Sequence, residues 1–243
     1  MSHVRAAPSW RARCTPEPER RAVRDAVLFD VHGNLAALDA VLAEAQAEGF
    51  DRLLFGGDLV LFGPEPAACV DRLRGLGDRL FAIKGNTDRY VIDRQDEVTR
   101  WSDALGKDRL AWLEVLPAQL VVPEQDALLV HATPRGDEEM LMPDTPASEA
   151  VAMLAGVEQH TLLCGHVHIQ YRRPLAGREV VNPGSVGMPL DGDPRAAWAI
   201  ISDGQVELRR VPYDVGAVAD RVAREDGPFA DMVARRLRTA RRD

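Results

Sequence analysis

The 243-residue sequence has no apolar run that approaches the ~20 residues a membrane-spanning helix requires, so we expect no membrane partner. The N-terminus lacks the apolar core of a signal peptide, and its acidic residues fit poorly with a transit peptide. Cysteine is scarce: the three cysteines form neither a disulfide framework nor a C-x-x-C pair. Together these absences predict a protein of the reducing cytoplasm.

Lysine is nearly absent too, with 2 residues against 28 arginines, and the net charge of −8 is unevenly distributed. Residues 1–25 carry six arginines against three acids, and residues 233–243 carry five against one, which leaves −15 for residues 26–232. A body this acidic argues against broad docking on nucleic-acid phosphates. Solvated tails are a commoner explanation of the basic ends than contact with a polyanion.

What the chain does contain is the composition of a soluble globular protein, with 46% hydrophobic and 28% charged residues. The length fits one large domain or two small ones. Residues 1–25 have three prolines among charges and no periodicity, which predicts a disordered basic tail. Folded structure is expected over 26–243, with two closing helices from about residue 214.

The first half of the folded region alternates predicted strands and helices. Apolar strands are expected over 26–30, 53–55 and 80–83. Between them, helices are expected at 35–48, where Asn34 is a plausible N-cap, and at 66–76. This alternation is typical of a parallel sheet.

Polar side chains follow the ends of these three strands: Asp30, His32, Asp58 and Asn86. Each one alone reads as a turn residue, because Asp and Asn favour turns. Four metal-type ligands on three successive strand ends are much less expected by chance, and this edge is where ligands bind in open α/β sheets.

The second half is richer in strands. A helix is expected over 98–116, followed by a hairpin of strands 119–122 and 127–130 that ends on His131. After a long loop and a helix near 148–155, a short apolar strand leads to His166 and His168, which are expected on an extended segment with both rings on one side. Four antiparallel strands complete this half, at 169–173, 179–181, 196–202 and 206–211.

Taken together, the motifs resemble those of the calcineurin-like metallophosphoesterase superfamily, in its small prokaryotic branch. They are Asp30-Val31-His32-Gly33-Asn34, Gly57-Asp58, Gly85-Asn86-Thr87-Asp88, His131 and Gly165-His166-Val167-His168. The resemblance runs from about residue 26 to the C-terminus and implies one domain with an α/β, four-layer αββα fold of two mixed sheets. It also implies hydrolysis of a small phosphomonoester or phosphodiester, through attack by a water or hydroxide that bridges two metal ions.

The resemblance assigns seven metal ligands. One ion takes Asp30, His32, Asp58 and His168, and the other takes Asp58, Asn86, His131 and His166. Asp58, Asn86 and His131 are also the expected catalytic residues, with Asn34 as a candidate phosphate contact that a helix cap explains about equally well. The mixed nitrogen and oxygen ligands suit Mn, Fe, Zn, Co or Ni, and the sequence does not choose among them.

Thr87 departs from the common pattern, because many relatives have a histidine after the metal-binding asparagine. A threonine is no useful general acid near neutral pH, so that contribution is missing or supplied elsewhere. The alternative hypothesis is therefore a weakly catalytic or non-catalytic scaffold on the same fold. The sequence leaves the oligomeric state open.

Overall fold

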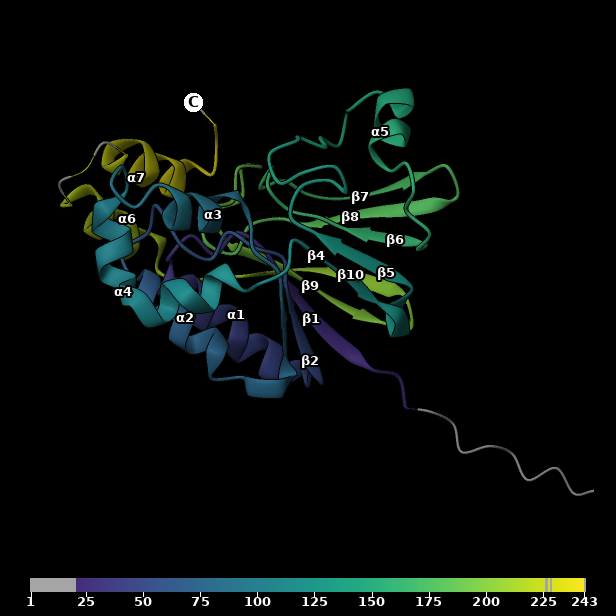
Figure 1. Ribbon diagram of the computed structural model, residues 1–243, viewed down its shortest axis with the longest axis horizontal. Helices are drawn as coiled ribbons and strands as arrows, with labels where there is room; N and C mark the ends of the chain where they lie inside the picture. Colours follow the sequence, from purple (N-terminus) through teal and green to yellow (C-terminus); the bar gives the residue numbers. More distant parts are fainter. Residues whose placement is uncertain (1–20, 226, 228, 243) are drawn as a thin grey trace, which may run out of the picture.

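The computed structural model describes residues 21–225, 227 and 229–242. Two five-stranded sheets pack face to face, and helices cover their outer faces (Figure 1). The strand orders are β10-β9-β1-β2-β3 in the first sheet and β4-β5-β6-β8-β7 in the second. Both sheets contain parallel and antiparallel pairs, which confirms the predicted αββα sandwich.

The first sheet has a parallel centre and an antiparallel edge. Its strands are β1 (Arg24–Leu28), β2 (Arg52–Phe55), β3 (Leu80–Ala82), β9 (Ala196–Ser202) and β10 (Gln205–Val211). β1 pairs in parallel with β2, and β2 with β3, whereas β9 runs antiparallel to β1. The carboxyl ends of β1, β2 and β3 therefore meet at one edge of the sheet.

The second sheet combines a hairpin with parallel strands. Its members are β4 (Gln119–Val122), β5 (Ala127–Val130), β6 (Thr161–Leu163), β7 (Gln170–Leu175) and β8 (Arg178–Pro183). β4 and β5 form the predicted hairpin, and β5, β6 and β8 are mutually parallel neighbours. β8 was expected to be antiparallel, and it is so only toward β7. The carboxyl ends of β5 and β6 also share one edge.

Alternation along β1 shows how the layers are filled. Ala26 and Leu28 belong to the apolar cluster beneath the helices, whereas Val27 and Phe29 belong to the cluster between the sheets. Leu163 of β6 lies in that same inter-sheet cluster. A strand buried on both faces is continuously apolar, which is why this segment was recognisable from sequence.

Seven α-helices complete the described chain: α1 (Leu35–Glu48), α2 (Pro66–Arg74), α3 (Asn86–Asp93), α4 (Thr99–Glu114), α5 (Ala147–Met153), α6 (Val215–Ala223) and α7 (Ala230–Thr239). Asn34 and Gly49 cap α1 as predicted. α4 is interrupted at Gly106, whose φ is 68°. Within the described ranges, no helix combines the length and apolar character needed to cross a bilayer.

α6 and α7 form a hairpin that we call the C-terminal cap (residues 215–239), and it lies beside α3 and α4 (Figure 1). Its apolar face includes Val218, Val222, Val233 and Leu237, which pack with Met188 in one cluster. The cap is thus attached to loops at the carboxyl ends of the strands.

The structure departs from expectation most clearly at β1 and α3. β1 begins at Arg24, so two residues of the expected tail pair in the sheet, and it ends at Leu28 rather than at Asp30. Residues 1–20 of that tail lie outside the described residues. α3 begins at Asn86 and was not predicted, because Asn86, Thr87 and Asp88 have the composition of a turn.

Candidate metal centre

Five loops converge where the carboxyl ends of the two sheets meet. Asp30 and His32 follow β1, Asp58 follows β2, and Asn86 starts the helix after β3. From the second sheet, His131 follows β5, and His166 and His168 follow β6. All seven residues expected as ligands are therefore brought to one place.

The side chains divide into two groups whose ligand atoms lie within 4.8 Å of one another. The first group is Asp30, His32, Asp58 and His168, and the second is Asp58, His131 and His166. Asn86 joins the second group, since its side-chain amide lies 3.0 Å from His131 Nε2 and 3.0 Å from His166 Nδ1. Asp58 belongs to both groups and stands between them.

Backbone carbonyls orient three of the imidazoles. His131 Nδ1 lies 2.9 Å from the carbonyl of Gly56, and His168 Nδ1 lies 2.7 Å from that of Met188. His166 uses the opposite nitrogen, with Nε2 at 3.1 Å from the Glu138 carbonyl. A carbonyl accepts only from N–H, so each contact fixes a ring proton on the outer nitrogen and turns the other nitrogen inward.

The first group brings buried hydrogen-bond acceptors together with too few protons to satisfy them all. His168 Nε2 lies 3.0 Å from His32 Nε2. Burial lowers the pKa of His32 to about 4 and lowers that of His168, so both rings are neutral at pH 7. Asp30 Oδ1 is buried and has no hydrogen-bond partner among the described residues. This donor set fits a divalent cation.

The second group stabilises positive charge at His131. Burial alone would lower the pKa of His131, but the Asp58 carboxylate, 3.4 Å from Nε2, raises it to about 10. Burial would conversely raise the pKa of Asp58, yet His131 and His32 hold it below its usual range. A cation that replaced the His131 proton would occupy a position where the protein already stabilises positive charge.

The backbone of the ligand loops is strained. Five of the seven expected ligands have left-handed φ values: Asp30 (55°), His32 (49°), Asp58 (59°), His166 (66°) and His168 (59°). Such conformations cost about 1–3 kcal/mol each and persist only where the surroundings enforce them. The expectation of an extended segment for His166 and His168 was therefore wrong, since β6 ends at Leu163 and both residues have left-handed φ. The two rings nevertheless fall in different groups, as the ligand assignment expected.

Two glycines allow the loops to approach this closely. A Cβ at Gly85 would lie 2.2 Å from Asp58 Oδ1, and one at Gly165 would lie 2.4 Å from the Phe29 ring and 2.8 Å from Asp30 Oδ2. Any larger residue would displace a ligand carboxylate. This explains why glycine precedes Asn86 and His166 in the sequence.

Asp88 has a structural role that the sequence did not show. Its buried carboxylate accepts four backbone N–H groups, from Asp58 (2.9 Å), Leu59 (2.9 Å), Val60 (3.1 Å) and Gly85 (3.0 Å). It thereby ties the Asp58 loop to the start of α3, where Asn86 lies. The available signal was an acidic residue in the first turn of an unrecognised helix.

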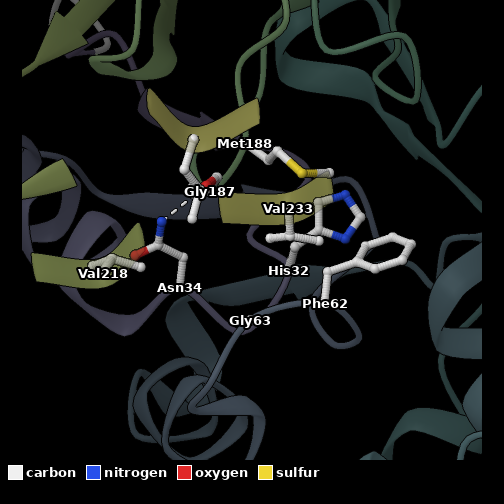
Figure 2. Close-up of a pocket in the computed structure, with 9 residues that line it drawn as sticks. His32, Asn34, Phe62, Gly63, Gly187, Met188, Val218 and Val233 are labelled. Atoms are coloured by element: carbon white, nitrogen blue, oxygen red, sulfur yellow. Dashed lines mark hydrogen bonds between the residues drawn. The ribbon is translucent and has the colours of Figure 1, made fainter. Parts of the chain in front are cut away.

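Thr87 and Asn34 are engaged in holding the framework. The Thr87 hydroxyl donates to the Val60 carbonyl at 2.9 Å, and its N–H donates to Asp58 Oδ1 at 2.8 Å. The Asn34 amide donates to Gly187 O (2.8 Å) and Tyr213 Oη (3.2 Å), as Figure 2 shows for Gly187. These contacts occupy the Asn34 amide, and its Oδ1 caps α1. A phosphate contact by Asn34 stays an expectation.

A cleft of about 300 Å³ opens onto the two groups. Asp58, Asn86, His32, His166 and His168 are among the residues that line it. Its remaining lining comes from Phe62, Thr87, Tyr90, Met188, Leu190, Arg236 and Arg242. The cap and the following residues therefore contribute to the same cleft as the ligand groups.

The architecture and this cluster define an αββα protein with a buried group of metal-type side chains at its strand ends. A model of the calcineurin-like phosphoesterase superfamily domain matches residues 24–204, and the chain belongs to this family of metal-dependent phosphoesterases.

Individual relatives support this placement. The chain is 28% identical to an uncharacterized protein of Methanocaldococcus jannaschii over 84% of this chain and 93% of the relative. It is 26% identical to the phosphodiesterase YfcE of Escherichia coli, over 72% of this chain and 85% of that protein. A crystal structure of a metallophosphoesterase from Sphaerobacter thermophilus superposes with a TM-score of 0.78 at 28% identity, covering 90% of this chain and all (100%) of that one.

Proposed function

We propose that this protein is a dinuclear metal-dependent phosphoesterase that hydrolyses a small phosphate ester. The observation that carries the proposal is the pair of ligand groups that share Asp58. An anionic bridge is what two closely spaced dications require, because their mutual repulsion is otherwise uncompensated.

Seven side chains would hold the ions. Asp30, His32, Asp58 and His168 form the first position, and Asp58, Asn86, His131 and His166 form the second. Mn, Fe, Zn, Co or Ni suits this mixed donor set. Bound there, two such ions would neutralise a phosphate ester and act as Lewis acids on its phosphoryl group, so that water can attack near neutral pH.

The protein's own contribution is to fix the donors before substrate arrives. The Gly56, Glu138 and Met188 carbonyls set which imidazole nitrogen faces inward. Asp88 holds the Asp58 loop against α3. Because these groups are already oriented, little reorganisation is needed during reaction.

A phosphodiester is the better supported of the two substrate classes, since YfcE is named a phosphodiesterase and the similarity spans most of both chains. The cleft of about 300 Å³ limits the substrate to a small molecule or to one end of a larger one. The cytoplasm stays the proposed compartment. One domain from residue 26 onward stays the proposed organisation.

The test is turnover of p-nitrophenyl phosphate and bis(p-nitrophenyl) phosphate with Mn²⁺, together with elemental analysis of the purified protein. We expect close to two ions per chain and faster hydrolysis of the diester. Faster turnover of the monoester would reverse the substrate preference. Absence of both metal and turnover would favour the scaffold hypothesis instead.

A further inference from the structure

The cleft has a second cationic feature that the metal centre does not use. Arg236 of α7 and Arg242, beyond the end of α7, both line it together with the ligand residues. We propose that these two arginines bind a second phosphate group of the substrate, so that the preferred substrate carries two phosphates. This inference rests on the proposed phosphoesterase function and adds to it a binding site for a second anionic group of the substrate.

The C-terminal cap holds Arg236 in a defined place. Phe62, from the loop after β2, packs on the His32 ring at 5.3 Å between centroids and on Phe229 at 5.6 Å. Figure 2 shows Phe62 and Met188 flanking His32, with Val233 of α7 alongside. The cap is thus packed directly against the loops that carry the ligands.

The residues after α7 are fixed as well. The N–H of Gly192 donates to the Ala240 carbonyl at 2.8 Å, and Asp191 and Arg241 form an antiparallel bridge. Because Arg241 pairs through its backbone, the position of Arg242 follows from this bridge. Arg242 Nη1 lies 3.9 Å from Met140 Sδ, in the segment between β5 and α5.

Neither arginine is paired with a carboxylate of the described residues. Elsewhere on the cap, Arg221 pairs with Glu65 at 2.9 Å and Arg238 pairs with Asp220. Arg236, in contrast, has a buried Nε without a hydrogen-bond partner within the described chain. A half-buried guanidinium with an unsatisfied donor is suited to bind an anionic ligand.

The position of Arg242 is supported by the cleft that it shares with His166. The Arg242 charge therefore lies near the outer ligand of the second group. A substrate phosphate at the ligand groups would have Arg242 within reach of its neighbouring group.

Charge balance favours a phosphate over a neutral group at this place. Asp30 and Asp58 offset about half the charge of two divalent ions, so the centre retains roughly the charge that one phosphate neutralises. The positive charges of the two arginines therefore exceed what a single phosphate neutralises. Guanidinium groups bind phosphate oxygens in bidentate geometry, which fits a second phosphate well.

The second phosphate could adjoin the first through an anhydride oxygen or lie apart on the same molecule. Both sources present the same chemistry to the arginines, and two probes distinguish them. An α,β-methylene nucleoside diphosphate has contiguous phosphorus atoms and resists hydrolysis at that link, whereas a nucleoside 3′,5′-bisphosphate has separate ones. A nucleoside 5′-monophosphate is the single-phosphate reference.

The experiment measures binding of these three probes by calorimetry at a fixed free Mn²⁺ concentration. In the wild-type protein we expect one of the two-phosphate probes to bind about tenfold or more tightly than the monophosphate. The double variant Arg236→Ala/Arg242→Ala should remove that preference while keeping both metals and monophosphate binding within about threefold. Arg241→Ala is the matched control, because it deletes the adjacent exposed arginine and should retain the preference.

Hydrolysis of bis(p-nitrophenyl) phosphate by the same variants separates the two proposals. Turnover of this single-phosphate substrate should persist in the double variant. Equal affinity of the wild-type protein for all three probes, or a preference that survives the double substitution, would overturn the role of the arginines while leaving the phosphoesterase intact. Loss of metal and turnover from the wild type would instead refute the proposed function itself.

Discussion

The two ligand groups share Asp58 but differ in charge and exposure. The first group contains two carboxylates, and all four of its residues are buried. The second has Asp58 as its only carboxylate, adds the neutral Asn86, and includes His166, which is partly exposed. Since buried carboxylates bind dications more strongly than neutral donors do, the first position should bind tightly and the second should exchange.

Asp58→Asn should weaken metal binding at both positions, so the difference in affinity between them should disappear. The substitution removes the charge that compensates the repulsion between two dications, so we expect a loss of activity on the order of 10³-fold or more. Elemental analysis should find fewer than two ions per chain, and circular dichroism should confirm that the fold persists. A variant that kept both ions and most of its turnover would show that Asp58 is not the bridge.

His166→Ala should separate the two positions. It removes a ligand from the exposed group only, so we expect about one ion per chain to remain and activity to fall by about 10²-fold or more. The matched control is His160→Ala, since His160 belongs to neither group. If the His166 variant retained two tightly bound ions, the assignment of a separate second position would be wrong.

The number of protons released on metal binding should differ between the two positions. At pH 7, below the pKa of about 10 that Asp58 gives His131, this ring is protonated without metal and must lose a proton when an ion binds. His32, with a pKa of about 4, is already neutral there. Affinity at the second position should therefore rise with pH and level off near pH 10.

Calorimetric titration with Mn²⁺ in buffers of different ionisation enthalpy measures this release. The His131→Gln variant should release fewer protons than the wild type, since glutamine offers a neutral donor in place of the protonated ring. Binding heats that do not depend on the buffer would contradict the expected protonation of His131.

The smallest expected effect concerns Thr87. Its hydroxyl is bound to the Val60 carbonyl, so it gives no proton to a leaving group, and wild-type rates should depend steeply on leaving-group pKa. Thr87→His should improve the poorest aryl phosphate substrates most, by about tenfold. Thr87→Ser is the control that keeps a hydroxyl. A shallow dependence in the wild type, with chemistry limiting the rate, would show that another group supplies the acid.

The convergence of the expected ligand residues was predictable from sequence, because they follow apolar strands whose parallel order fixes where the strand ends meet. Asp30, Asp58 and Asn86 could be placed at one edge from strand order alone. The left-handed backbone at His166 and His168 could not be predicted, because an apolar strand followed by two alternating histidines has the pattern of a continuing extended segment.

Asp88 and Arg236 were missed for different physical reasons. The role of Asp88 depends on N–H groups of a loop 28 to 30 residues away in sequence, which no local pattern shows. Arg236 is one of five arginines in the basic segment 233–243, and only the packing of the cap shows which of them face the cleft. The composition identified the segment as basic, but it could not predict which way any side chain points.

The left-handed backbone of the ligand loops also has a consequence for descent. Positions 30, 32, 58, 166 and 168 must satisfy two separate demands, one chemical and one conformational. If a lineage abandoned catalysis, only the chemical demand would vanish, because the strand ends would still require φ values near +55°. Residues that tolerate this geometry, namely Asp, Asn and Gly, would then be selected there, so an inactive descendant would keep part of the motif for the sake of its fold.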